Sequence, residues 1–294
     1  MIETTLRIKK YWRRIASFDN DNRSASRICE HYLIEKELAA RLLRSSAEER
    51  TTLYTQLYDE LFTKIPDHPQ HTRSRDEGQA VQHQIDFLKK LVPTSARFAE
   101  IGAGDCRVSL GLAGHCHSVA ALDVSECVQV AGKRPLNFSF IKIDGTHLPL
   151  PDGSVDFFYS NQLMEHLHPD DAQAQLDEIY RVLSPGGFYF CSTPHAFTGP
   201  HDVSKYFDDY PTGFHLIEYR YADLTRLFRA AGFSKISIVW ERRGRYLVAP
   251  SFLGVWLEKA VMGLLGAYRS QLSLNRKIHA LMGIMILGQK GAPG

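Results

Sequence analysis

The chain has 294 residues, which is enough to bury a substantial core, either as one large domain with an appendage or as two small domains. Its composition is 44% hydrophobic and 23% charged with a formal net charge of +2, so nothing in it requires a nucleic acid or a strongly acidic partner. The five cysteines are Cys29, Cys106, Cys116, Cys127 and Cys191. They form no CxxC pair, which favours reduced thiols over a disulfide framework and offers no zinc motif.

The first residues, MIETTLRIKKYWRR, are too charged for the apolar core of a secretory signal. We therefore expect the mature chain to begin near Met1 and the protein to be cytoplasmic.

Helical spacing dominates the N-terminal third. Residues 26–65 carry apolar side chains at helical intervals, with Ser45 and Ser46 separating two helices. A further helix is predicted over about Asp76–Leu91, after a segment broken by two prolines. The sequence thus predicts an N-terminal helical extension over residues 1–92.

The pattern then changes to short apolar runs that alternate with helical segments. Strands are predicted at RFAEIG, HSVAALD, FSFIKID, VDFFYSN and GFYFCST, and later at FSKISIVWER and LMGIMILGQK. Strands separated by helices pair in parallel, with helices on both faces of the sheet. Residues 93–294 are therefore predicted to form a doubly wound α/β domain with a mostly parallel, seven-stranded sheet.

The stretch FAEIGAGDCRVSL joins the first strand to a helix at the sheet edge where doubly wound folds bind ligands. Gly102 and Gly104 allow positive φ angles and a close approach of the backbone to a ligand. A dinucleotide fingerprint would have its third glycine at Arg107, which weakens a reading as an NAD site. Asp123 ends the next strand, 19 residues beyond Gly104, where a carboxylate can accept both ribose hydroxyls of an adenosine.

Four motifs then follow in order: EIGAGDCR, ALDVS, IDGTHLPLPDGSVDFFYSNQLMEHL and IYRVLSPGGFYFCSTP. Over about residues 96–195 they resemble the successive motifs of class I S-adenosylmethionine-dependent methyltransferases of the methyltransferase type 11 kind. The resemblance implies a Rossmann-like methyltransferase fold and S-adenosyl-L-methionine as the cofactor. It does not specify the acceptor.

Carried onto this chain, the resemblance also implies residue roles. Glu100, Gly102 and Gly104 would form the loop that holds the methionine moiety, and Asp123 would take the ribose hydroxyls. The family usually has a glycine where Cys106 stands, so this loop departs from the pattern.

The same resemblance places the other half of the cofactor. Asp144 and Gly145, after the third strand, would border the adenine, with Asp144 accepting from its amino group. Asn161 and Gln162, at the end of the fourth strand, would lie beside the sulfonium.

The sulfonium is already activated, so the protein mainly has to align an acceptor with the methyl group. A general base helps when the acceptor is a hydroxyl. NQLMEHLHPD supplies Glu165 and His166 just beyond the fourth strand, and His166 is the first candidate for this base. Residues 192–224 are far longer than an ordinary connection and are predicted to bind the acceptor, with His201 and His215 as further catalytic candidates.

Imidazole and carboxylate groups that suit zinc or iron also gather in this segment, at His195, His201, Asp202 and His215. Their spacing matches no tight metal motif, so we favour a hydrogen-bonded acceptor pocket and predict no metal site.

Residues 246–280, before the last strand, are predicted to form an apolar helical insertion. Pro250, Glu258 and Lys259 interrupt it, so it falls short of a membrane span. Residues 252–268 predict an amphipathic helix with basic flanks, which fits a membrane surface. A helix that covers the substrate pocket or forms a homodimer face is the alternative.

The leading prediction is thus a methyltransferase that acts on a small-molecule, saccharide or lipid-linked acceptor, at oxygen. An NAD-dependent oxidoreductase and a catalytically inactive cofactor-binding regulator are the alternatives. The expected partners include no nucleic acid, but do include a peripheral membrane contact through residues 246–280 and a second copy of the chain.

Overall fold

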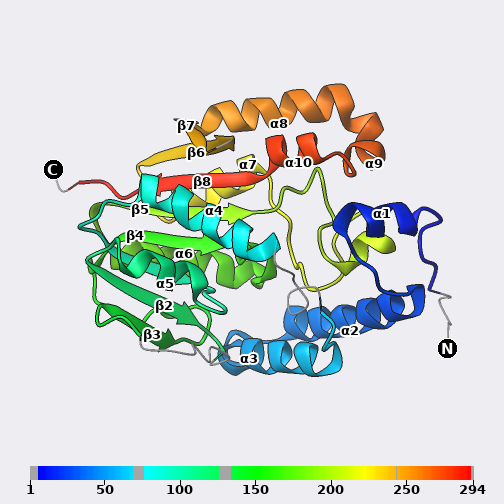
Figure 1. Cartoon of the computed structure of the whole chain (residues 1–294), viewed down its shortest axis with the longest axis horizontal. Coiled ribbons are helices and arrows are strands. Elements are labelled where there is room, and N and C mark those ends of the chain that lie inside the picture. The colour runs from blue at the N-terminus through cyan, green and yellow to red at the C-terminus, as the bar shows by residue number, and fades with distance from the viewer. Residues whose placement is uncertain (1–5, 69–75, 126–133, 243, 293–294) are drawn as a thin grey trace.

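The computed structural model of the chain describes residues 6–68, 76–125, 134–242 and 244–292, so Cys127 lies outside the described residues. One sheet organises the molecule (Figure 1). Its strands are β1 (Arg97–Ile101), β2 (Ser118–Asp123), β3 (Phe138–Lys142), β4 (Val155–Asn161), β5 (Leu183–Thr193), β6 (Lys235–Arg242), β7 (Arg245–Pro250) and β8 (Ile284–Gln289).

The strand order is β3-β2-β1-β4-β5-β8-β6-β7. The first five strands pair in parallel, and β8 runs antiparallel between β5 and β6. All seven predicted strands are therefore present, within a mostly parallel doubly wound sheet.

The eighth strand was not predicted. Residues 245–250 pair antiparallel with β6, from Arg245 opposite Arg242 to Pro250 opposite Ser237. Gly244, with φ +75°, supplies the left-handed backbone that such a reversal needs. The segment predicted as a helical insertion from residue 246 thus begins as an edge strand.

Helices surround the sheet. They are α1 (Trp12–Asp19), α2 (Ala25–Arg44), α3 (Ala47–Lys64), α4 (Asp76–Leu91), α5 (Arg107–Ala113), α6 (Pro169–Val182), α7 (Tyr221–Ala230), α8 (Ser251–Leu265), α9 (Arg269–Leu272) and α10 (Arg276–Met282), with short 3₁₀ turns η1 (Met164–His166), η2 (Val203–Tyr206) and η3 (Gly266–Tyr268). The predicted break between α2 and α3 is confirmed, because Ser46 caps α3 in a reciprocal capping box with Glu49.

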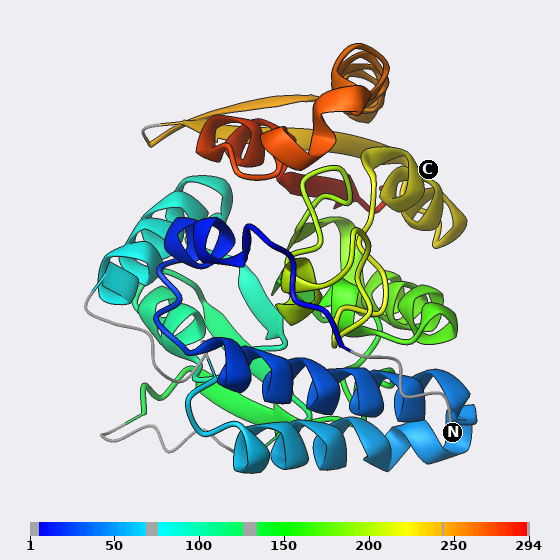
Figure 2. The same cartoon turned by 90° about the vertical axis from the view of Figure 1, so that its right-hand side faces the viewer.

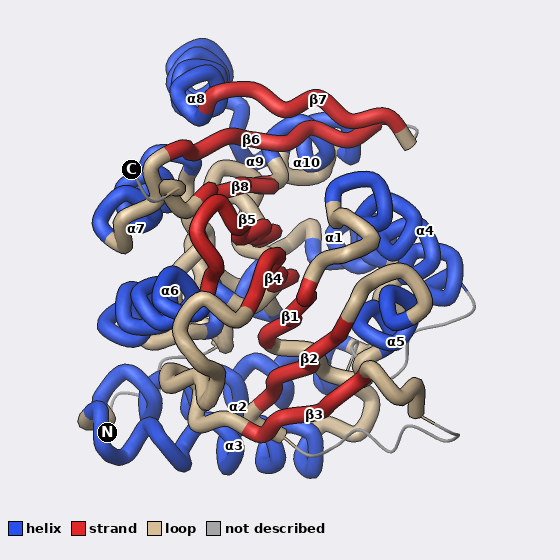
Figure 3. The backbone as a smooth tube through the Cα atoms, turned by 90° about the vertical axis from the view of Figure 1, so that its left-hand side faces the viewer, coloured by secondary structure: helices blue, strands red, loops and turns tan. Residues whose placement is uncertain are grey.

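Each face of the sheet buries its own core, since alternate strand residues point to opposite sides. Ala99 and Ile101 pack in the core formed with α3, α6 and α7, while Phe98 packs under α4 and α5. Figure 3 shows α6 and α7 on one side of the sheet and α4 and α5 on the other.

The N-terminal helices α1 and α2 lie beyond the carboxyl ends of the parallel strands (Figure 1). Leu38 of α2 and Leu57 of α3 belong to the same core as the sheet. Buried between α3 and α6, the Arg50 guanidinium and the Tyr54 hydroxyl both donate to Asp171 of α6, each at 2.7 Å. The division at residue 92 stays a prediction, but these contacts bring the N-terminal helices to the edge of the sheet where ligands bind.

The helix α8, which follows β7, lies against β6, β7 and α7, at one extreme of the molecule (Figure 2). Across the described ranges, no helix combines the length and the apolar character that crossing a membrane requires.

Candidate active site

The turn after β1 is built from glycines with left-handed backbone. Gly102 has φ +71° and Gly104 has φ +51°. The amides of Gly102 and Ala103 donate to the Leu122 carbonyl at 2.9 and 3.2 Å, which fixes the turn to β2. A Cβ on Gly102 would lie 3.1 Å from Leu163, whereas one on Gly104 would meet open space. The backbone at Gly104 is therefore accessible to a ligand.

Asp123, at the end of β2, closes this turn. Its Oδ2 accepts from the Gly104 amide at 2.8 Å, and its Oδ1 accepts from the Ser125 amide at 3.0 Å. Burial raises the pKa of Asp123, and the backbone hydrogen bonds oppose that rise. Each carboxylate oxygen keeps a second lone pair, so the two oxygens can still accept a pair of ribose hydroxyls.

Asp144 and Gly145 follow β3. Asp144 Oδ1 accepts from the amides of Thr146 and His147, at 3.0 and 2.9 Å. Gly145 has φ +107°, and a Cβ there would lie 3.0 Å from the Tyr54 ring. This turn therefore packs tightly against α3 and leaves Asp144 at the sheet edge.

Asn161 and Gln162 stand at the end of β4, and both are exposed. Gln162 has φ +53°, which is uncommon for a side chain that is not glycine, and its amide donates to the Ser192 carbonyl at 2.8 Å. Strained backbone of this kind clusters at functional sites. It turns the chain sharply out of β4 into η1.

Glu100 lies beneath the glycine turn. It is buried, and its Oε2 accepts from the Ser109 hydroxyl of α5 at 2.5 Å. Burial raises the pKa of Glu100 to about 8, against the hydrogen bonds from Ser109. The side chain thus ties β1 to α5 directly behind the turn.

The structure brings Glu165, His166 and His215 together, with one ligand atom of each within 4.8 Å of the others. The His166 Nδ1 lies 2.8 Å from the Phe214 carbonyl, and the His215 Nδ1 lies 2.9 Å from Glu218 Oε1. The two imidazole rings meet edge to face at 4.8 Å. The stretch after β4 and the predicted acceptor segment therefore form one site.

The two imidazoles have opposite electrostatic environments. Burial, with the charge of His215, lowers the pKa of His166 to about 3. Burial also acts to lower the pKa of His215, but the hydrogen bond to Glu218 and the charges of Asp202, Glu218 and Glu165 raise it to about 9. At neutral pH His166 is neutral and His215 carries a proton.

The other histidines of the acceptor segment separate. His201 Nδ1 lies 3.2 Å from Glu218 Oε2, so His201 and His215 share one carboxylate. His195 is fully buried and faces α8, with Nε2 3.1 Å from Glu258 Oε2. Within the part of the chain that the structure describes, the set His195, His201, Asp202 and His215 does not converge on one point.

Sequence reasoning missed residues that α2 and α3 contribute. Glu35 Oε2 accepts from the Phe214 amide at 3.1 Å, and the Tyr58 ring lies 6.2 Å from the His166 ring. Both occupy ordinary positions of a helical hairpin in the sequence. Only the fold brings them to the end of β4.

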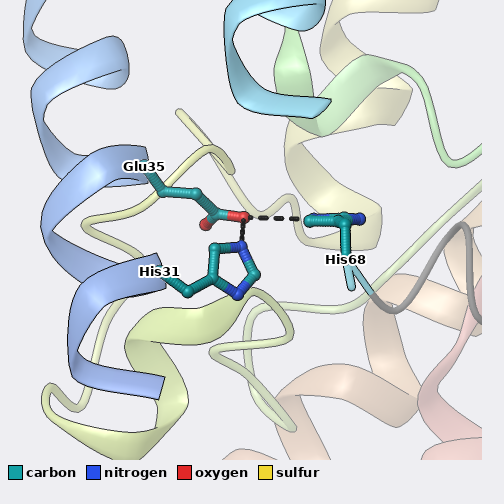
Figure 4. Close-up of side chains that lie close together, drawn as sticks. All are labelled: His31, Glu35 and His68. Atoms are coloured by element: carbon teal, nitrogen blue, oxygen red, sulfur yellow. Dashed lines mark hydrogen bonds and ion pairs between the residues drawn. The ribbon is translucent and has the colours of Figure 1, made fainter. Parts of the chain in front are cut away.

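Glu35 belongs to a second cluster, with His31 and His68 (Figure 4). Its Oε1 lies 2.8 Å from His31 Nε2 and 3.5 Å from His68 Nε2. All three side chains are buried. The cluster anchors α2 beside the acceptor segment.

A cavity of about 340 Å³ adjoins the acceptor segment. Its lining includes His201 and three cationic side chains, Lys9, Lys205 and Arg269, together with Phe18 of α1. The cavity thus reaches the imidazole that shares Glu218 with His215.

Residues 99–191 match the family model of a methyltransferase domain. A probable S-adenosylmethionine-dependent methyltransferase of Mycolicibacterium smegmatis is 44% identical over 86 residues, 29% of this chain and 31% of that protein. Another, MT3114 of Mycobacterium tuberculosis, is 30% identical over 160 residues, 53% of this chain and 56% of that protein. The chain thus spans about a third of the length of the first of these relatives and about half of the second.

Among solved structures, phosphoethanolamine N-methyltransferase 1 of Haemonchus contortus, in complex with phosphoethanolamine and S-adenosylhomocysteine, superposes with a TM-score of 0.56. The match covers 85% of this chain and 50% of that one. Because the sequence identity is 17%, the similarity supports the fold alone. The glycine turn, the acid at the end of β2 and these similarities agree. Residues 99–191 therefore resemble the methyltransferase domain of S-adenosylmethionine-dependent enzymes.

Proposed function

We propose that the protein transfers the methyl group of S-adenosylmethionine to an oxygen of a small-molecule, saccharide or lipid-linked acceptor. One observation carries the proposal: the open glycine turn, the Asp123 carboxylate and the His166 imidazole all stand at the carboxyl ends of adjacent parallel strands. A cofactor bound along this edge would have its sulfonium between the glycine turn with Asp123 on one side and the His166 imidazole on the other.

The residues proposed to hold the cofactor follow the edge of the sheet. Gly102 and Gly104 receive the methionine moiety, and Asp123 receives the ribose. Asp144 with Gly145 borders the adenine, and the exposed pair Asn161 and Gln162 lies beside the sulfonium, while Glu100 supports the turn from behind.

His166 is the proposed general base. Its Nδ1–H donates to the Phe214 carbonyl, so its Nε2 carries the lone pair. As the acceptor oxygen bonds to the methyl carbon and the carbon–sulfur bond breaks, the hydroxyl proton becomes strongly acidic and passes to Nε2. A weak base therefore suffices, and its contribution is about 10² to 10⁴-fold in rate.

The acceptor's body is proposed to occupy the cavity beside His201. Its volume of about 340 Å³ is in the range of small-molecule sites. His201 and His215 are proposed to orient the acceptor. The carboxylate of Glu218, which contacts both imidazoles, holds them in place.

Binding of the cofactor tests this function against an NAD-dependent oxidoreductase. We expect one S-adenosylmethionine per chain by calorimetric titration and no heat with NADH. Asp123→Ala removes the acceptor of the ribose hydroxyls and is expected to weaken binding by about tenfold to a hundredfold or more. Asp177→Ala, at an exposed position of α6, is the matched control.

Turnover separates an enzyme from an inactive regulator. His166→Ala is expected to bind the cofactor as the wild type does and to release S-adenosylhomocysteine about 10² to 10⁴-fold more slowly with a hydroxyl acceptor. Tight NADH binding, or cofactor affinity unchanged by Asp123→Ala, contradicts the proposal.

We also propose a peripheral membrane contact through β7 and α8. Both elements expose large apolar side chains, among them Leu247 at 60%, Phe252 at 63% and Trp256 at 69%. The flanking residues Arg245 and Lys259 are exposed and basic, as at anionic membrane surfaces. A second copy of the chain is the competing occupant of this surface.

A further inference from the structure

We propose that Glu165, His166 and His215 form a binding site for one divalent transition-metal ion of the zinc or cobalt type, at the acceptor end of the methyltransferase site. The sequence predicts no metal site, and the residues considered for one were His195, His201, Asp202 and His215. The new set comes from two separate parts of the chain that the fold joins.

The three side chains converge closely enough. One carboxylate oxygen of Glu165 and one nitrogen of each imidazole lie within 4.8 Å of one another. Ligands at about 2.1 Å from zinc stand roughly 3.4 Å apart in a tetrahedron. Each side chain therefore has to move inward by less than about an ångström.

The hydrogen bonds orient both imidazoles as ligands. His166 directs its Nδ1–H at the Phe214 carbonyl, and His215 directs its Nδ1–H at the Glu218 carboxylate. Metal-bound histidines almost always donate their remote N–H to such acceptors, which leaves the other nitrogen for the ion. The Nε2 atoms of both rings are thus the available ligands.

Glu165 supplies the third ligand. Its side chain is fully buried, and Oε2 accepts from the Thr193 hydroxyl at 2.8 Å. Oε1 is buried without any hydrogen-bond partner among the described residues. An unpartnered carboxylate oxygen in the interior is costly, and a bound cation removes that cost.

The surroundings are negatively charged. Asp202 and Glu218 face His215 from the acceptor segment, and Glu35 approaches the same segment from α2. These carboxylates favour a positive charge at this position, and a bound cation supplies one.

The second cluster of the described residues, His31, Glu35 and His68, provides a contrast (Figure 4). The Arg23 guanidinium lies 2.7 Å from His31 Nδ1, and a guanidinium can only donate. His31 Nδ1 is therefore the acceptor, and its Nε2–H donates to Glu35 at 2.8 Å. Both ring nitrogens of His31 are thus engaged by Arg23 and Glu35, and these hydrogen bonds anchor α2.

Three protein ligands leave coordination positions open, as in catalytic metal sites. Resting on the proposed function, we assign one of them to the acceptor oxygen. Coordination lowers the pKa of the hydroxyl, whose proton leaves to solvent, and the resulting oxygen anion attacks the methyl carbon as the carbon–sulfur bond breaks. His166 is then a ligand, and the ion takes over the activation of the acceptor.

Cobalt(II) titration of the full-length protein, freed of metal by chelation, tests the site. We expect one ion per chain, with visible absorption bands of a low-coordinate nitrogen and oxygen site. Glu165→Gln, His166→Gln and His215→Gln should each weaken binding at least tenfold. Glu218→Gln, which removes the partner of His215, should weaken it by about 10 to 100-fold.

A matched control loses an imidazole elsewhere. His117→Gln lies at the exposed amino end of β2. This variant should bind cobalt as the wild type does. Retained S-adenosylmethionine affinity shows that each variant is folded.

The proposal is overturned by a wild type that binds no stoichiometric cobalt, by binding that survives all three ligand substitutions, or by binding that is lost in His117→Gln. Methyl transfer that continues undiminished in chelator overturns the role given to the ion in acceptor activation. Cobalt bound at these ligands without any methyl transfer contradicts the proposed function and leaves the metal site standing.

Discussion

Cys106 occupies a backbone conformation that favours glycine. Its φ is 57°, and it caps α5 directly after the glycine turn. The class I family usually has glycine at this position, and the left-handed conformation gives the physical reason. In this chain the buried thiol fills the core beneath α5 instead.

Two substitutions separate the backbone from the thiol. Cys106→Gly and Cys106→Ala both remove the thiol, but only alanine keeps a Cβ in the left-handed region. We expect Cys106→Gly to be the more stable by about 1 kcal/mol in chemical unfolding, with cofactor affinity preserved. Alanine equal to or more stable than glycine contradicts this account of the turn.

Glu100 makes the stability of the protein depend on pH. Its pKa is raised to about 8 in the fold, mainly by burial, from an ordinary value of 4.5. Between these values the unfolded chain loses the proton that the folded chain retains. The unfolded state then binds fewer protons, so the free energy of unfolding falls as the pH rises from about 4.5 to about 8.

Glu100→Gln keeps a hydrogen-bond acceptor for Ser109 and removes the titration. The free energy of unfolding of Glu100→Gln minus that of the wild type should therefore rise with pH, by up to about 1.4 kcal/mol per pH unit between about pH 4.5 and about pH 8. Urea unfolding at several pH values measures it. Glu48→Gln, at an exposed position of α3, should track the wild type, and a pH-independent difference for Glu100→Gln speaks against a protonated buried carboxyl.

Among the helices and turns, α2 and η2 hold residues 213–215 of the acceptor segment between them. Glu35 of α2 accepts from the Phe214 amide, while Asp202, at the start of η2, accepts from the amides of Gly213 and His215 at 3.1 and 3.2 Å. The segment in turn supplies the carbonyl that orients His166. Glu35 and Asp202 are thus positioning residues for the imidazoles.

Gly213 lies where the two carboxylates approach each other. A Cβ there would stand 2.5 Å from Glu35 Oε2 and 2.6 Å from Asp202 Oδ2. Gly213→Ala must displace the segment, and we expect methyl transfer to fall by about tenfold to a hundredfold with cofactor affinity unchanged. Gly78→Ala, in α4 with nothing within 4 Å of the new Cβ, is the control that should leave both unchanged. An active Gly213→Ala variant contradicts the positioning role.

At the scale of the whole molecule, the sequence predicts what depends on local pattern. Strand periodicity and the order of the motifs were sufficient to predict the strands of the sheet and which residues lie at its carboxyl edge. The same pattern failed at β7, because residues 245–250 form a strand through pairing with β6, and their apolar run alone does not distinguish strand from helix.

The site could be predicted only in part for the same reason. His166 and His215 were candidates because each belongs to an unusual stretch of sequence. The contacts of Glu35 with Phe214 and of Tyr58 with His166 each join residues more than a hundred positions apart. No local sequence pattern predicts such contacts. Long-range packing decides which helix reaches the site.

The apolar surface of β7 and α8 is a property of the assembled molecule. Trp256→Ser removes an indole that is 69% exposed, and we expect it to weaken binding to vesicles with anionic lipid by about tenfold. Tyr210→Ser, at an equally exposed aromatic residue elsewhere, should have no effect. Vesicles that fail to retain the wild type, or equal retention of both variants, exclude the membrane contact and favour a second copy of the chain.

A structure of the protein with S-adenosylhomocysteine would test the proposed cofactor site. We expect the ribose on Asp123, the adenine beside Asp144, and the sulfur at the Asn161–Gln162 turn, facing His166 and His215. S-adenosylhomocysteine bound away from the carboxyl edge of the sheet, or with its sulfur turned from both imidazoles, would contradict it.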